Sequence, residues 1–396
     1  MVNPTYEKLG SAPSMIRELF AYGLRRSAEV GPENVFDYSL GNPSIPAPQP
    51  VQQALLDVLH DTDPIQVHGY SMAGGFDGTR RAVAEDLTHR FGMTIRPEEL
   101  FFTCGAAAAL ISVIRALTVS PDSEFVAIAP YFPEYLPFVE SNGGKLVSVP
   151  ADLDTFQISL DILEAHLTSH TQAVLVNSPN NPTGCIYSRE TIQAIHEVVR
   201  EHPLFLLCDE VYRDLADTED YESLSACSDL RPRLIVAQSF SKPYAMTGWR
   251  LGYALGPVPV IAQMTKLHQY GIMSAPTTAQ YAAIEALRNG DRDVEMMRGE
   301  YDMRRRLVVD SFNAMGLTCF EPLGAFYVFP CIKSTGLTSE EFCTRLIVDK
   351  HVAVVPGTAF GESGEGFVRV SYSYSIKHLK IALERIKEFL DELKKG

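Results

Sequence analysis

The chain has 396 residues, of which 46% are hydrophobic and 21% charged, so it is long enough for two globular domains and is neither disordered nor fibrous. A net charge of −15 and a pI near 5.1 argue against nonspecific binding to nucleic acid or to an anionic membrane surface. The seven cysteines are scattered without a C-x-x-C pair, which favours free thiols in a reducing cytoplasm over a disulfide framework or a zinc site.

The N-terminal segment shows no basic stretch followed by an apolar core, so it does not resemble a signal peptide. The most apolar helical stretch ends at Arg115 and is too short to span a bilayer. We therefore expect a cytoplasmic protein without a membrane partner.

The middle of the chain alternates short apolar runs with helical patterns such as residues 107–117 and 188–201. Several of the runs are apolar throughout, which is typical of strands covered on both faces in a mostly parallel sheet. We predict an α/β fold with a large domain whose central sheet is flanked by helices. The predicted strands are residues 101–103, 125–129, 145–149, 173–177, 204–209, 234–238 and 252–255.

From about Ala282 the sequence changes to longer, charged helices. Thr338 and Glu341 form a T-x-x-E capping box that predicts a helix start, and the apolar residues of 378–395 fall on one helical face. We predict a smaller α+β domain built from both ends of the chain. The predicted units are 1–40 (an N-terminal arm and part of the small domain), 41–282 (the large domain) and 283–396 (the small C-terminal domain).

Three segments place polar groups at predicted strand ends. Gly105 separates a strand from a helix, a junction that suits a phosphate but often only turns the chain. The segment NSPNNPTG (177–184) reads either as a loop or as a pair of ligand-binding amides. Asp209 ends an apolar run, so its carboxylate needs a cation, either a buried arginine or a protonated ring nitrogen, with Tyr212 close by.

The segment SFSKPYAMTGWR (239–250) places Lys242 just after a buried strand and Arg250 eight residues later. A second cation nearby would disfavour protonation of the lysine and favour a nucleophilic amine. A surface lysine is the ordinary alternative. The S-x-x-K pattern of serine acyl-enzymes is another, but the chain lacks the S-D-N and K-T-G motifs that accompany it.

A phosphate site, a buried acid, amide and phenol groups and a lysine at strand ends together fit pyridoxal 5'-phosphate, whose aldehyde reacts with a lysine amine. The chain also resembles the class I/II aminotransferases of the fold-type I pyridoxal-phosphate superfamily. The resemblance runs from YSLGNPSIPAP through NNPTG, DEVY and SFSKPYAMTGWRLGY to GAFYVFP and VRVSYS, in that order, over nearly the whole chain.

The resemblance implies that Lys242 binds the cofactor covalently and moves the substrate proton. It also implies that Asp209 pairs with the protonated pyridine nitrogen, and that Asn181 and Tyr212 hydrogen-bond the ring oxygen. The groups implied for the phosphate are those of Gly105, Ala106, Ala107, Ser239, Ser241 and Arg250.

Five further residues follow from the same resemblance. Phe132 matches an aromatic residue that stacks on the cofactor ring, although a core phenylalanine is the simple alternative. Arg369 matches the arginine that grips the substrate α-carboxylate, near Gly41 and Asn42. Tyr70 matches a tyrosine that reaches the phosphate of the neighbouring subunit, so we expect a homodimer with shared sites.

The expected activity is ping-pong transfer of an amino group from an L-amino acid to a 2-oxo acid. Ala107 stands where aspartate-specific relatives carry a lysine, so the donor stays open between aspartate, aromatic and other amino acids. A pyridoxal-phosphate-dependent C–S β-lyase shares the first chemical step and is the main alternative. A non-catalytic cofactor-binding regulator is the second.

Overall fold

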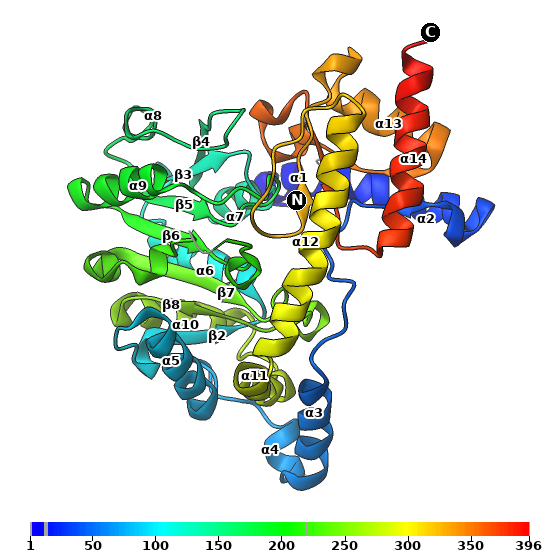
Figure 1. The fold of residues 1–396 in the computed structure, drawn as a ribbon. Coiled ribbons are helices and arrows are strands. Elements are labelled where there is room, and N and C mark those ends of the chain that lie inside the picture. The colour runs from blue at the N-terminus through cyan, green and yellow to red at the C-terminus, as the bar shows by residue number, and fades with distance from the viewer. Residues whose placement is uncertain (1, 12–14, 219–220, 396) are drawn as a thin grey trace.

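The computed structural model describes residues 2–11, 15–218 and 221–395, and its largest feature is a seven-stranded sheet in the order β2-β8-β7-β6-β5-β3-β4 (Figure 1). In this sheet β8 alone runs in the opposite direction, so its pairings with β2 and β7 are antiparallel and the other pairings are parallel. The strands are β2 (Leu100–Thr103), β3 (Glu124–Ala129), β4 (Lys145–Pro150), β5 (Thr171–Asn177), β6 (Phe205–Asp209), β7 (Leu234–Ser239) and β8 (Gly252–Leu255).

All seven predicted strands are confirmed, and the packing explains why their sequences are apolar throughout. In β3, Val126 and Ile128 belong to the core on one face of the sheet, while Phe125 and Ala127 belong to the core on the other. Successive side chains of a strand point to opposite faces, so a strand covered on both sides needs no polar alternation.

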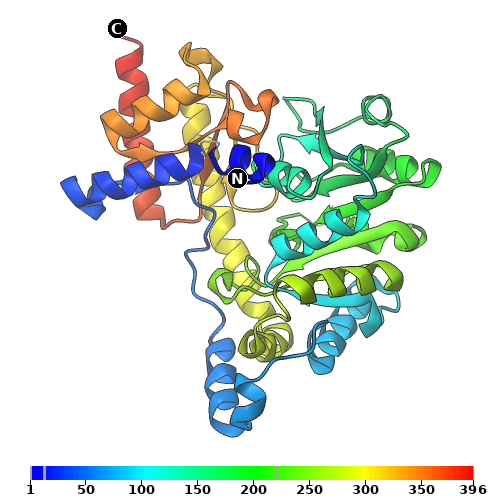
Figure 2. The same ribbon diagram turned by 180° about the vertical axis from the view of Figure 1, so that it is seen from behind.

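Helices cover both faces of the sheet. Those in front in Figure 1, including α5 and α9, pack on one face, and α6 and α10 cover the face seen in Figure 2. No helix among the described residues combines the length and the apolar character that crossing a membrane requires. The helices up to α11 are α1 (Pro4–Ser11), α2 (Met15–Val30), α3 (Gln49–Asp61), α4 (Pro64–His68), α5 (Asp77–Phe91), α6 (Ala106–Leu117), α7 (Tyr135–Glu140), α8 (Leu160–Glu164), α9 (Arg189–Glu201), α10 (Val258–Gly271) and α11 (Thr277–Asn289).

A smaller α+β layer lies beside the large sheet, as predicted (Figure 1). It holds an antiparallel sheet in the order β11-β12-β9 and a parallel pair, β1 with β10, in which Phe36 lies opposite Val352. The N-terminal segment therefore joins the C-terminal third, which confirms that both ends of the chain build this layer. Its elements are β1 (Phe36–Asp37), α12 (Asp291–Ala314), β9 (Tyr327–Val328), α13 (Ser339–Lys350), β10 (Val352–Ala353), β11 (Val355–Pro356), β12 (Val368–Ser371) and α14 (Ile376–Leu393).

The long helix α12 connects the two parts. Val294, near its start, packs in a core cluster of the large sheet, whereas Met297, Tyr301 and Val308 pack in the cluster of the smaller layer. The change from one cluster to the other thus lies within the first turns of α12. The division of the chain at residues 282 and 283 stays a prediction.

The capping box at the start of α13 gives a test of local stability. Thr338 Oγ1 accepts a hydrogen bond from the Glu341 backbone N–H, and the Glu341 carboxylate accepts one from the Thr338 N–H at 2.9 Å. We expect Thr338→Ala to lower the free energy of unfolding by about 1 kcal/mol, because a donor of the first turn loses its partner. Urea unfolding followed by circular dichroism measures this. Thr338→Ser, which keeps the hydroxyl, should remain close to wild type, and equal stability of the Ala and Ser variants would contradict the prediction.

Candidate active site

The carboxyl ends of three neighbouring strands meet at one edge of the large sheet and form one end of a cavity of about 320 Å³. Asn177 ends β5 and lies opposite Asp209, which ends β6, and Ser239 ends β7. Ligands of open α/β sheets bind at this edge. The cavity is lined by Ser39, Leu40, Gly41, Ala106, Ala107, Leu110, Phe132, Glu134, Asn177, Asn181, Asp209, Val211, Tyr212, Ser239, Ser241, Lys242, Thr247, Arg250, Tyr327 and Arg369.

Asp209 is a buried carboxylate without a salt bridge to any described residue. Its Oδ2 accepts a hydrogen bond of 2.7 Å from the Tyr135 hydroxyl, and the backbone N–H of Val211 donates a longer one of 3.4 Å to Oδ1. Burial raises the pKa of Asp209 to about 6, and these two hydrogen bonds act in the opposite direction. A buried carboxylate in this state is stabilised by a cation. The salt bridge to a buried arginine that we considered from the sequence is not found among the described residues.

Lys242 lies in the cavity with its Nζ donating a hydrogen bond of 2.6 Å to the Gly41 carbonyl oxygen. Burial is the main cause that lowers the pKa of Lys242 to about 8, and the positive charges of Arg369 and then Arg250 lower it further. The direction agrees with the prediction of a nucleophilic amine. The cause differs from the one we predicted. Loss of water lowers the pKa of Lys242 more than either arginine does. Of the two arginines, Arg369, which is 127 positions away in the chain, has a larger effect than Arg250.

The N-terminus of α6 forms an anion-binding corner of the cavity. The first N–H groups of a helix have no partner within the helix, and in α6 no side chain at the N-cap accepts from them. Gly105 has a φ of +89°, and a Cβ there would lie 2.6 Å from Arg250 Nη2, so glycine lets the guanidinium approach. Among the described residues, Arg250 donates hydrogen bonds to the carbonyl oxygens of Thr247 and Cys104 alone. The hydroxyl oxygens of Ser239 and Ser241 lie 2.8 Å apart on the same side.

Arg369, on β12 of the smaller layer, forms the opposite end of the cavity. Its Nη1 donates to Asn181 Oδ1 at 2.9 Å and its Nη2 to the Ser39 carbonyl oxygen at 2.5 Å, while its buried Nε has no hydrogen-bond partner among the described residues. The guanidinium carbon lies 4.6 Å from the centre of the Tyr327 ring. A buried cation held between neutral oxygens and a ring is a suitable site for a carboxylate.

The structure brings most of the predicted site residues to one cavity. Gly105 and Asn42 lie next to it rather than in its wall. Asn42 Oδ1 accepts a hydrogen bond of 2.7 Å from Thr247, which does line the cavity. Tyr70 is 88% exposed and does not line the cavity of its own chain.

Four cavity or supporting residues were missed in the sequence. Tyr135 holds Asp209, and Tyr327 lies 3.0 Å from Tyr212, hydroxyl to hydroxyl. Asn177 donates to the Asp209 carbonyl and accepts from the Asn181 N–H. Its place at the end of an apolar run, like that of Asp209, is a signal that could have identified it. Glu134 follows Phe132 by two positions and carried no recognisable signal.

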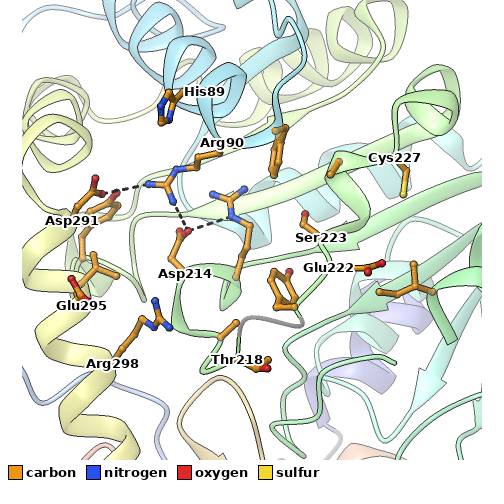
Figure 3. A pocket seen from close by; sticks show the side chains of 18 residues that line it. His89, Arg90, Asp214, Thr218, Glu222, Ser223, Cys227, Asp291, Glu295 and Arg298 are labelled. Carbon is orange, nitrogen blue, oxygen red and sulfur yellow. Dashed lines mark hydrogen bonds and ion pairs between the residues drawn. The ribbon is translucent and has the colours of Figure 1, made fainter. Parts of the chain in front are cut away.

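A second cavity, of about 1060 Å³, has Arg90, Asp214 and Arg298 among its lining residues (Figure 3). Arg90 forms ion pairs with Asp214 at 3.2 Å and with Asp291 at 3.5 Å, and Arg213 forms one with Asp214 at 3.3 Å. No lysine is among its lining residues, so this cavity offers no amine for a covalent cofactor. The smaller cavity is the better candidate.

Comparisons with known proteins agree with this assignment. The family model for aminotransferase class I and II matches residues 33–386. The chain belongs to this family. "Putative aminotransferase YugH" of Bacillus subtilis is 40% identical over 380 residues, 96% of either chain. "Aromatic-amino-acid aminotransferase 2" of Thermococcus litoralis is 37% identical over 388 residues, 96% of this chain and 97% of the relative. The crystal structure of an aspartate aminotransferase from Thermotoga maritima matches with a TM-score of 0.91 at 32% identity, covering 98% of this chain and 100% of that one.

This aminotransferase family depends on pyridoxal 5'-phosphate, and the cavity fits that group. A buried carboxylate without a salt bridge to a described residue, an uncapped helix N-terminus beside Arg250 and a lysine amine of lowered pKa line the same space. They match, in turn, the ring nitrogen, the phosphate and the aldehyde of the cofactor.

The pKa of Lys242 can be tested in the cofactor-free protein. We expect its rate of acetylation by a trace of acetic anhydride to rise with pH to a midpoint near 8, because only the neutral amine reacts and burial lowers its pKa. Peptide mass spectrometry gives the rate at each site. Lys145 is the internal control, since its hydrogen bond to Asp122 raises its pKa. Arg369→Gln should move the Lys242 midpoint upward, and a Lys242 midpoint near 10.5 in the wild-type protein would contradict this reading.

Proposed function

We propose that this aminotransferase transfers the amino group of an L-amino acid to a 2-oxo acid, with Lys242 as the cofactor-binding and proton-transferring residue. The observation that carries the proposal is the arrangement of one cavity, with Lys242 and Asp209 in its wall and Arg369 at the opposite end. The family membership supports the reaction class. The shared early step leaves the β-lyase alternative to experiment, and no contact in the cavity favours it.

Each group of cavity residues would contact a different part of the cofactor. Asp209 would hold the pyridine nitrogen protonated, and Asn181 and Tyr212 would contact the ring oxygen. Phe132 would pack on the ring. The phosphate would lie against the N-terminus of α6, the two serine hydroxyls and Arg250. When bound, the cofactor supplies an aldehyde for the amino group and a ring that accepts the electron pair left by the α-proton.

Lys242 moves the proton in this proposal. Its Nζ accepts the α-proton of the substrate once the amine is free and returns it on the cofactor side, which requires a neutral amine. The pKa of about 8 allows that state near neutral pH. Arg369 binds the α-carboxylate and so fixes the α-carbon relative to Lys242. The Gly41 carbonyl oxygen accepts the hydrogen bond from Lys242, and a Cβ at this position would lie 1.8 Å from the Tyr327 hydroxyl oxygen.

One cavity of this size serves the two substrates in turn, so we expect ping-pong kinetics. The amino donor stays open between aspartate, aromatic and other amino acids. The cytoplasmic location stays a prediction from the cysteine pattern.

The covalent role of Lys242 can be tested without turnover. Borohydride reduction of the holoenzyme should fix the cofactor to the peptide that contains Lys242, as seen by mass spectrometry. Lys242→Ala should lose this adduct and lower kcat by at least about 10²- to 10⁴-fold, the range typical of general acid–base catalysis. Lys145→Ala, at an exposed ion pair with Asp122, serves as control and should keep both. An adduct on another lysine would contradict the assignment.

We further propose that the protein is a homodimer in which Tyr70 reaches the phosphate of the partner's site. Tyr70 is exposed and lies among other exposed apolar side chains, a feature of interfaces. The two segments that carry most of them are joined by hydrogen bonds of 3.0 Å, from Ser71 to the Ala275 carbonyl and from Thr277 to the Gly69 carbonyl. The exposed neighbours are Ile65, Met72, Tyr270, Ile272 and Met273.

Tyr70→Phe tests this contact. We expect the dissociation constant of pyridoxal 5'-phosphate to rise about 10- to 100-fold, because a hydrogen bond to a charged group is lost. Absorbance titration of the cofactor-free dimer measures it, and sedimentation gives the oligomeric state. Tyr270→Phe, in the same exposed patch, should leave cofactor affinity unchanged. A monomer with full cofactor affinity would contradict both the dimer and the role of Tyr70.

A further inference from the structure

Tyr327 is a buried tyrosine of the cavity wall to which the proposed function gives no role. It lies on β9 of the smaller layer, and its hydroxyl oxygen is 3.0 Å from that of Tyr212, which follows β6 of the large sheet. Neither hydroxyl forms another hydrogen bond with a described residue. The pair therefore joins the two parts of the chain at the place where Tyr212 is proposed to contact the cofactor.

The position of the Tyr327 hydroxyl is fixed by its surroundings. The strand β9 pairs with β12, so that Tyr327 lies opposite Ser371, and the guanidinium carbon of Arg369 lies 4.6 Å from the centre of the Tyr327 ring. A Cβ at position 41 would lie 1.8 Å from the hydroxyl oxygen, so a glycine at this position leaves the space to the tyrosine. The hydroxyl is therefore held beside that of Tyr212 by packing on several sides.

The number of protons decides which of the two hydroxyls donates. A phenol has one proton to donate and lone pairs that accept, and in the structure either hydroxyl can be the donor. If Tyr212 contacts an ionised ring oxygen, its only proton goes to that oxygen, because an ionised oxygen can only accept. The bond between the hydroxyls then requires Tyr327 as its donor. A hydroxyl that accepts one hydrogen bond is polarised and donates a stronger one, so the two bonds reinforce each other.

We infer that Tyr327 is a positioning residue, whose hydroxyl donates to Tyr212, directs the Tyr212 proton toward the cofactor and so stabilises the ionised ring oxygen. The inference rests on the proposed function, because it needs the contact between Tyr212 and the ring oxygen. It adds a residue of the smaller layer to the groups that act on the cofactor. Two tyrosines that only filled space would give a different result, since loss of the Tyr327 hydroxyl would then leave the cofactor unaffected.

The experiment is a double-mutant cycle of Tyr327→Phe, Tyr212→Phe and the double variant. Tyr327→Phe removes the hydroxyl and keeps the ring beside Arg369. We expect the dissociation constant of pyridoxal 5'-phosphate to rise about 3- to 10-fold, because the ring oxygen is less well stabilised. For the same reason, the pH midpoint of the absorbance change of the bound cofactor should rise by about half a pH unit. In the Tyr212→Phe background, loss of the second hydroxyl should change neither value, since its effect passes through Tyr212.

Tyr372→Phe is the matched control. Tyr372 is a buried tyrosine of the smaller layer outside the cavity wall, and its hydroxyl donates to the Ala325 carbonyl oxygen at 3.3 Å. This variant also loses a buried hydrogen bond, but it should keep both wild-type values.

Two results would overturn the inference. One is a Tyr327→Phe variant with wild-type values. The other is an equal change with and without the Tyr212 hydroxyl, which is what a structural role of Tyr327 would give. Failure of the proposed function has a different signature, because Tyr212→Phe would then itself leave the pH midpoint unchanged, and the basis of the inference would be lost with it.

Discussion

The burial of two opposite charges at neighbouring strand ends is the constraint on which the rest of the site depends. Asp209 is buried and Lys242 is partly buried at the end of a sheet whose strands are apolar on both faces, so neither charge is solvated as it would be at a surface. The hydrogen bonds from Tyr135 and to Gly41 satisfy part of the lost hydration. The lost hydration that these bonds do not replace favours a neutral amine at Lys242 and a cationic partner for Asp209, which supports the roles proposed for the two residues.

The cavity is a joint product of the two parts of the chain. Asp209 ends β6 and Lys242 follows β7, both in the large sheet. Arg369 lies on β12 of the smaller layer and donates a hydrogen bond to Asn181, which follows β5 of the large sheet. The N-terminal segment adds the carbonyl groups of Ser39 and Gly41. A change in the relative position of the two parts along α12 would therefore move Arg369 away from Lys242. In the proposed function, this division places the group for the substrate carboxylate on one part of the chain and most of the groups for the cofactor on the other.

Sequence reasoning succeeded where local physics dominates. The strands from Leu100 to Leu255 could be predicted because burial on both faces leaves continuous apolar runs. The Thr338 capping box could be predicted because its two residues are only three positions apart. Contacts between segments that are far apart in the chain were harder to predict from the sequence. The hydroxyl pair of Tyr212 and Tyr327 joins residues 115 positions apart, and no periodicity encodes it. Tyr135 sits on a six-residue helix whose orientation is set only by packing.

The pKa shifts link cofactor binding to stability. Burial raises the pKa of Asp209 to about 6, so this carboxylate destabilises the cofactor-free fold above pH 6, and the cost is relieved as the pH falls toward its ordinary value of 3.8. Burial lowers the pKa of Lys242 to about 8, so its charge destabilises the fold below pH 8, and that cost is relieved as the pH rises toward 10.5. Between pH 6 and 8 both costs are present. A ligand that neutralises the amine and offers a cation to the acid removes both in this window, so the same burial that tunes the chemistry also favours the loaded protein.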